Sequence, residues 1–136
     1  TVSQEGKVTI KGCGKAVITI NAGETSECKT AVKKISIIIN PKKALIRKLS
    51  SPSKAKLKIS WEKDKKVTGY QVQISTNKKF KKGVMQRYFS KNQTNIRISL
   101  KNKSGKKYYV RIRSYKRSEG MDYYGAWSKV KKTKIK

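Results

Sequence analysis

The sequence predicts an all-β protein in which an antiparallel β-sandwich follows a small three-stranded β segment. Apolar and polar residues alternate with period two through most of the 136 residues, which is the pattern of half-buried strands. No stretch shows a convincing helical period. The alternation stops at Asn40-Pro41 and restarts after it, so we place a boundary there, with one unit at residues 1–40 and another at residues 41–136.

The first unit is predicted to contain three strands, two of them joined as a hairpin around the turn Gly12-Cys13-Gly14. Residues 21–34 lack periodicity and are interpreted as a surface loop. Three strands leave an apolar face uncovered, so we expect either a part of a domain or a strand-exchanged homodimer through residues 1–40. The alternating apolar residues of these strands are Val8, Ile10, Ala16, Ile18, Ile20, Ile35, Ile37 and Ile39.

The second unit is predicted to contain seven short strands separated by turn signals. Seven such strands in about 95 residues are typical of an antiparallel β-sandwich. In chain order, the strands carry Ala44, Ile46 and Leu49; Ala55, Leu57, Ile59 and Trp61; Tyr70, Val72 and Ile74; Val84 to Phe89; Ile96, Ile98 and Leu100; Tyr108, Val110 and Ile112; and Trp127 to Ile135.

Composition narrows the classes of function. The chain has 36 Lys and Arg against 7 Asp and Glu, a net charge of +29, and no His, which removes the usual general base and the commonest metal ligand. With 35% hydrophobic residues it can still build a core. No apolar run approaches the roughly 18 residues of a membrane helix, so we expect a chain that does not span a membrane. It opens at Thr1 without a signal-like stretch, and we expect a mature product or an excised piece.

The positive charge is concentrated in the second unit, which carries +26 against +3 for residues 1–40. Thirty of the 36 cations are Lys, and no helix is available for a major groove, so we expect no specific nucleic-acid recognition. Lys at turns protects strand edges; the alternative is salt-dependent adhesion to wall polyanions, sulfated glycans or nucleic acid. The runs are Lys63-Asp64-Lys65-Lys66, Lys78-Lys79-Phe80-Lys81-Lys82, Lys101-Asn102-Lys103 and Lys106-Lys107.

Residues of about 42–136 resemble the fibronectin type III domain. The matching positions are Trp61, Thr68-Gly69-Tyr70, Leu100, Gly105-Lys106-Lys107-Tyr108 and Ala126-Trp127-Ser128. The resemblance implies structural roles for Trp61, Tyr70 and Leu100, and makes Tyr108 the tyrosine of the corner that leads into the sixth strand. Ser104 stands where the family usually has Pro. The fold that we expect is therefore a fibronectin III-like antiparallel β-sandwich.

Residues 1–40 are similar to the closing part of a bacterial immunoglobulin-like (Big-type) repeat. That resemblance rests on Gly-Lys-Val-Thr-Ile, a Gly-x-Gly turn, Lys-Ala-x-Ile-Thr-Ile and a last strand that ends in Asn-Pro. Tandem Lys-rich modules of this kind resemble the repeat regions of large secreted or wall-attached proteins of Gram-positive bacteria. The resemblance implies an extracellular, secreted or wall-associated location, with neighbouring domains of the same polypeptide as partners.

Cys13 and Cys28 are the two cysteines of the chain. Their spacing of 15 residues fits no close-set zinc pattern, and no His is present to complete a site, so we expect no metal. In an exported module a disulfide between them is plausible and would close a short loop. Two independent thiols are the alternative reading.

One surface is a candidate ligand platform. Arg111 and Arg113 face outward on one strand and Trp127 begins the strand expected beside it, so the indole is placed to stack between two guanidinium groups. The resemblance supports a structural stack of this kind. The same surface, with Tyr109, can instead serve as a platform for a glycan or an anionic polymer; its candidate residues are Arg111, Arg113, Tyr115, Tyr123, Tyr124 and Trp127.

We expect a non-catalytic protein without a cofactor. The carboxylate pairs Glu62 with Asp64 and Glu119 with Asp122 sit at predicted turns and are read as turn chemistry. The primary hypothesis is a structural spacer that presents another domain of a bacterial surface or secreted protein. The alternative is an adhesion module that binds a carbohydrate or a wall polyanion through its basic and aromatic surface.

Overall fold

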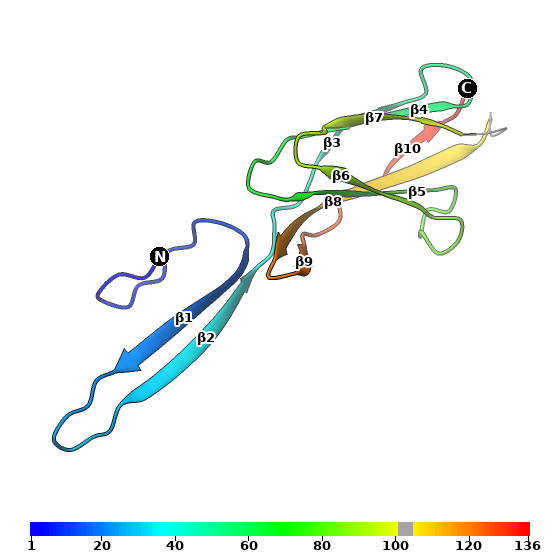
Figure 1. Cartoon of the computed structure of the whole chain (residues 1–136). Coiled ribbons are helices and arrows are strands. Elements are labelled where there is room, and N and C mark those ends of the chain that lie inside the picture. The colour runs from blue at the N-terminus through cyan, green and yellow to red at the C-terminus, as the bar shows by residue number, and fades with distance from the viewer. Residues whose placement is uncertain (101–104) are drawn as a thin grey trace.

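The computed structural model describes residues 1–100 and 105–136, and these residues form ten strands with no helix among them. An extended hairpin projects from one end of a β-sandwich (Figure 1). In the described residues no helix is long and apolar enough to cross a membrane. The strands are β1 Gly14–Ala22, β2 Ala31–Ile39, β3 Ile46–Ser50, β4 Lys56–Trp61, β5 Gly69–Ser75, β6 Met85–Ser90, β7 Asn95–Ser99, β8 Lys107–Ser118, β9 Met121–Tyr124 and β10 Lys131–Lys134.

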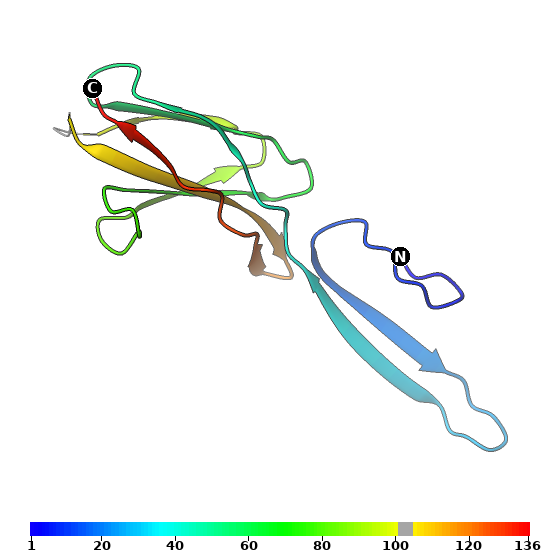
Figure 2. The same ribbon diagram turned by 180° about the vertical axis from the view of Figure 1, so that it is seen from behind.

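The sandwich has two layers, which the front and rear views show lying face to face (Figures 1 and 2). One is a three-stranded sheet in the order β3-β4-β7, and the other has the order β10-β8-β5-β6, with β9 paired to the far end of β8. All pairs are antiparallel. The predicted all-β sandwich is confirmed. A register shift between Ile46 and Lys48 marks a β-bulge in β3.

The core lies between the two sheets, because alternate residues of each strand point inward. Trp61 is 2% exposed and packs against Tyr70 and Phe89, with ring centroids 5.7 and 5.5 Å apart. The hydroxyl of Tyr70 accepts the backbone N–H of Asp64 at 2.6 Å. The buried hydrophobic residues are Ala44, Ile46, Leu57, Ile59, Trp61, Val67, Tyr70, Val72, Ile74, Ile96, Leu100, Tyr108, Val110, Ile112 and Ile135.

The residues named for a structural role are therefore in the core. Leu100 and Tyr108 are 3% and 2% exposed. Residues 101–104, which precede Tyr108 at the predicted corner, lie outside the described part. The predicted lysine run at 101–103 and Ser104 lie outside it as well.

The N-terminal unit differs from the prediction of three strands. It contains a two-stranded sheet, β1-β2, and the stretch around Val8 makes only an isolated bridge to Val2. The hairpin joins β1 to β2 through residues 23–30 and not through Gly12-Cys13-Gly14. The physical reason is that β1 and β2 have equal lengths and pair with each other over nine residues, from Gly14↔Ile39 to Ala22↔Ala31. Both strands therefore extend into residues 21–34, which were predicted to be a loop.

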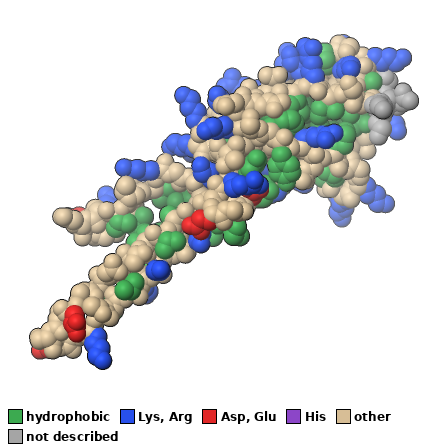
Figure 3. All heavy atoms as spheres, in the orientation of Figure 1, with side chains coloured by type: hydrophobic (Ala, Val, Ile, Leu, Met, Phe, Trp, Pro, Cys, Tyr) green, Lys and Arg blue, Asp and Glu red, His purple; other side chains and the backbone are tan. Residues whose placement is uncertain are grey.

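The hairpin has little core of its own. In the described structure no hydrophobic residue before Ala44 is buried, and both faces of the ribbon carry exposed apolar side chains. Val32 is 66% exposed and Ile38 is 58% exposed. Figure 3 shows hydrophobic side chains along the surface of this arm and a border of Lys and Arg around the sandwich. The stability of the chain therefore comes from the sandwich.

Candidate functional site

The outer face of the larger sheet holds two arginines in fixed positions. Arg111 pairs with Gln73 and Arg113 with Gln71 across the β8–β5 ladder. The Nε of Arg111 donates to Oε1 of Gln73 at 2.9 Å, and the Nε of Arg113 donates to Oε1 of Gln71 at 2.5 Å. Gln71 in turn donates to the hydroxyl of Tyr88 on β6 at 2.7 Å. These two glutamines of β5 set the orientation of both guanidinium groups.

Three aromatic rings alternate with these guanidinium groups. The Cζ of Arg111 lies 4.3 Å and that of Arg113 lies 4.5 Å from the ring centroid of Trp127. Phe80 covers Arg111 at 4.3 Å and Tyr124 covers Arg113 at 3.8 Å. We call these five residues the arginine–aromatic ladder. The predicted stacking of Trp127 between two guanidinium groups is confirmed.

The ladder joins segments that are distant in sequence. Phe80 lies in the β5–β6 connection, the arginines lie on β8, Tyr124 ends β9, and Trp127 lies in the irregular stretch before β10. The hydroxyl of Ser128 accepts the backbone N–H of Ile112 at 3.0 Å, which ties that stretch to β8 next to the indole. Each cation–π contact contributes about 0.5 to 2 kcal/mol, depending on exposure.

The charge of the two arginines is not balanced by an acid. The ion pairs found among the described residues are Lys15–Glu119, Arg47–Glu62 and Arg117–Asp122, and none involves Arg111 or Arg113. Burial lowers the pKa of both guanidinium groups, and the neighbouring charge of Arg113 lowers the pKa of Arg111 further. Both remain cationic near neutral pH, because the ordinary pKa of arginine lies far above neutrality.

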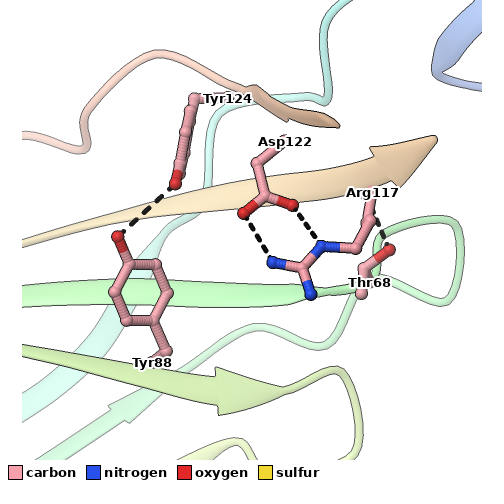
Figure 4. A network of polar contacts seen from close by, with 5 residues as sticks. All are labelled: Thr68, Tyr88, Arg117, Asp122 and Tyr124. Atoms are coloured by element: carbon pink, nitrogen blue, oxygen red, sulfur yellow. Dashed lines mark hydrogen bonds and ion pairs between the residues drawn. The ribbon is translucent and has the colours of Figure 1, made fainter. Parts of the chain in front are cut away.

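A tyrosine cluster adjoins the ladder at Tyr124. The ring centroids of Tyr88 and Tyr115 lie 5.8 Å apart, and those of Tyr115 and Tyr124 lie 6.1 Å apart. The hydroxyls of Tyr88 and Tyr124 are 3.4 Å apart (Figure 4). The hydrogen bond with Tyr88 is the main reason that the pKa of Tyr124 is raised to about 12, and burial adds to it.

A bidentate ion pair holds β9 beside β8 and so positions Tyr124. The Nε and Nη2 of Arg117 donate to the two carboxylate oxygens of Asp122 at 2.7 and 2.9 Å, and its backbone N–H donates to the hydroxyl of Thr68 (Figure 4). This pairing lowers the pKa of Asp122. The β8–β9 turn places Glu119 and Gly120 at φ of 51° and 76°, as a two-residue hairpin of type I′ requires.

The structure brings most of the predicted platform residues together. It adds two residues that were not predicted and places one predicted residue on another face. Phe80 and Tyr88 were not predicted to belong to this surface: Phe80 lies within a lysine run and Tyr88 lies within the predicted strand from Val84 to Phe89. Tyr123 pairs with Lys116 and, by strand alternation, lies on the opposite face of the β8–β9 ribbon from Tyr124. Tyr109 shares the face of Arg111 without entering the ladder.

The predicted disulfide is not formed in this structure. Both cysteines are free, Cys13 partly buried and Cys28 exposed. Cys13 precedes β1 at the base of the hairpin and its thiol donates to the carbonyl of Lys66 at 3.3 Å, whereas Cys28 lies in the loop at the other end. A nine-residue strand spans about 27 Å between them, and a disulfide requires Cα atoms within about 7 Å.

The carboxylates at the two predicted turns are engaged in ion pairs or turn hydrogen bonds. Glu62 lies 3.4 Å from Arg47 and Glu119 pairs with Lys15, so at least one acid of each predicted turn is paired with a cation. Asp64 accepts the backbone N–H of Lys66 through Oδ1, which is the turn role expected of it. No group of three or more His, Cys, Asp or Glu that could hold a metal ion occurs within residues 1–100 and 105–136.

The chain resembles solved fibronectin type III structures at low identity. A two-domain fibronectin type III segment of chicken tenascin matches with a TM-score of 0.69 and 16% identity, over 98% of this chain and 81% of that one. The FN1–FN3 domains of chicken CNTN1 match with a TM-score of 0.59 and 14% identity, over 93% and 44%. The fn3 domain of human contactin 1 matches with a TM-score of 0.57 and 11% identity, over 100% and 93%.

No family model matches the chain, and no curated protein matches it. The structural matches show the fold, which is a fibronectin type III-like β-sandwich.

We predict that Trp127→Ala lowers the free energy of unfolding by about 2 to 4 kcal/mol, because the substitution removes both contacts at the centre of the ladder and leaves a void beside them. Chemical denaturation followed by circular dichroism measures the loss. Val130→Ala, an exposed residue in the same stretch, is the control and should change little. An unchanged stability in Trp127→Ala would show that the ladder does not hold this segment.

We also predict that one tyrosine of the folded protein titrates near pH 12 and that Tyr88→Phe brings this pKa back toward 10. The folded-state pKa is raised, so the stabilisation by this hydrogen bond is complete below about pH 10 and is lost as the pH rises through about 12. Absorbance of the phenolate against pH measures both proteins. A wild-type titration in which every tyrosine ionises near 10 would contradict the assignment.

Proposed function

We propose that this chain is a non-catalytic spacer of an exported multidomain bacterial protein, with the hairpin belonging to the unit that precedes the sandwich. The observation that carries the proposal is the joint between them, which is short and anchored on both sides. A spacer has to fix how the parts that it connects are placed, and a short anchored joint does so. The resemblance of residues 1–40 to a bacterial repeat supports the exported, wall-associated setting.

The connection from β2 to β3 is packed against the sandwich. Pro41 and Ala44 are buried, and the hydroxyl of Ser114 on β8 donates to the carbonyl of Lys42. Gly125 allows this close approach, because a Cβ there would lie 2.6 Å from the carbonyl oxygen of Pro41. Few backbone torsions are therefore left free between the hairpin and the first strand of the sandwich.

The base of the hairpin is held at a second place. The ammonium of Lys15 on β1 lies 2.9 Å from Glu119 in the β8–β9 turn, and this contact raises the pKa of Lys15. Gly14 packs near Ser118, where a Cβ would meet the serine Cβ at 3.4 Å. An exposed ion pair contributes little by itself, but together with the anchored connection it restricts the direction of the arm.

The exposed apolar side chains of the hairpin need a cover. Ile20, Val32 and Ile38 are each at least half exposed, which is unfavourable for a ribbon in water. We assign the cover to further strands of the preceding unit, as the resemblance to a partial repeat implies. A second copy of the chain, paired through residues 1–40, is the alternative.

The rigidity of the joint can be measured with two spin labels. In a background of Cys13→Ser and Cys28→Ser, Thr19→Cys on β1 and Arg97→Cys on β7 give one label on each side of the joint. We predict a single narrow distance distribution in double electron–electron resonance, and a broader one when Glu119→Gln removes the partner of Lys15. Glu24→Gln, in the loop away from the joint, is the charge-matched control and should leave the distribution narrow.

A distribution that is already broad in the background with Glu119 intact would contradict the spacer proposal. An intermolecular contribution to the distance distribution that increases with protein concentration would instead show that a second copy covers the hairpin.

A further inference from the structure

We propose that the arginine–aromatic ladder is also a binding site for an extended anionic polymer that carries sulfate or phosphate groups. The proposal goes beyond the spacer role and does not depend on it. It rests on the free hydrogen-bond donors of Arg111 and Arg113, on their spacing, and on the charge of the surrounding sheet face.

Each guanidinium group of the ladder has donors left over. A guanidinium has five N–H donors, and in both residues the Nε–H is given to a glutamine of β5. Within the described residues, no acceptor is found for the terminal Nη groups of Arg111 or Arg113. The aromatic rings cover the flat faces of the groups, so the edge that carries these donors is the side open to a ligand.

The two edges are spaced to receive consecutive anionic groups of one chain. Arg111 and Arg113 are two residues apart on β8, which places their Cα atoms about 7 Å apart on the same face. A planar guanidinium edge donates two parallel hydrogen bonds to one sulfate or phosphate, a geometry that a lysine ammonium lacks. A polymer with repeated oxyanions can therefore use both arginines at once.

The surrounding face extends the positive field beyond the ladder. On β10, Lys132 pairs with Tyr109 and Lys134 pairs with Lys107, so strand alternation puts these lysines on the arginine face. The loop with Phe80 adds the four lysines of residues 78–82. Asp122, the acid beside Tyr124, is neutralised by Arg117. Such a field attracts polyanions in general, and the ladder adds geometry to it.

The ladder is also organised before any ligand arrives. Stacking on both sides and the bonds to Gln71 and Gln73 hold the two side chains, so binding costs less conformational entropy than with free surface lysines. This predicts tighter binding than the same number of free surface lysines would give. A neutral glycan lacks the oxyanions that the edges would receive.

The chain contains its own reporter for this site. Of its two tryptophans, Trp127 is in the ladder and Trp61 is 2% exposed in the core. We would titrate the ¹⁵N-labelled protein at near-physiological salt with a heparin-derived octasaccharide, a glycerol-phosphate oligomer and an oligogalacturonate. We expect the indole N–H of Trp127 and the Nε–H of Arg111 and Arg113 to shift in a saturable way with at least one of the first two ligands, while Trp61 stays fixed.

A matched pair of variants separates the ladder from general charge. Arg113→Lys keeps the net charge but removes the guanidinium edge, and we expect about tenfold weaker binding, the effect of losing one charge-assisted hydrogen bond. Arg97→Lys makes the same change on β7 of the other sheet and should leave the affinity unchanged. The heparin fragment and the phosphate oligomer then distinguish a sulfated from a phosphorylated polymer.

Three results would overturn the proposal. They are equal weakening by Arg97→Lys and Arg113→Lys, no saturable binding of either the heparin fragment or the glycerol-phosphate oligomer, and saturation without any shift at Trp127. Because the titration of the unmodified protein reports on the ladder directly, it decides the question even where Arg113→Lys fails to fold.

Discussion

The distribution of buried apolar side chains is the constraint on which the other features of this protein depend. Within the described residues, all buried hydrophobic side chains lie between Ala44 and Ile135, so the sandwich is the unit that supplies stability. The hairpin is held by backbone pairing and by its anchored joint. This contrast explains why the arm can extend away from the sandwich and why it needs a cover.

Strand β8 links that core to the surface. Its twelve residues alternate between buried positions, such as Val110 and Ile112, and outward positions that carry Arg111 and Arg113. The core therefore fixes the backbone from which the ladder projects, and the ladder in turn ties the segment of Trp127 to the sheet. The proposed polyanion site uses the middle of this strand and the proposed spacer uses its far end, which leads into the turn with Glu119.

Alternation along the chain predicted seven of the eight strands of the sandwich, all but β9, and the stacking of Trp127, because both depend on which face a residue occupies. It does not say which strands pair, and so the hairpin was assigned to the wrong turn and a third strand was expected near Val8. The predicted disulfide was wrong because the strand pairing was not known: the whole length of β1 separates Cys13 from Cys28. Phe80 reaches the ladder from an irregular loop at φ of 55°, which periodicity cannot show.

Hydrogen exchange, read amide by amide, tests most directly whether the sandwich is the stable unit and the hairpin depends on a cover. The account predicts that the central amides of β5 and β8 exchange only through global unfolding. Those of β1 and β2 should exchange orders of magnitude faster, because opening the hairpin exposes little that is buried. Equal protection in the two parts would contradict the account, since it would show that the hairpin forms a stable unit without any cover.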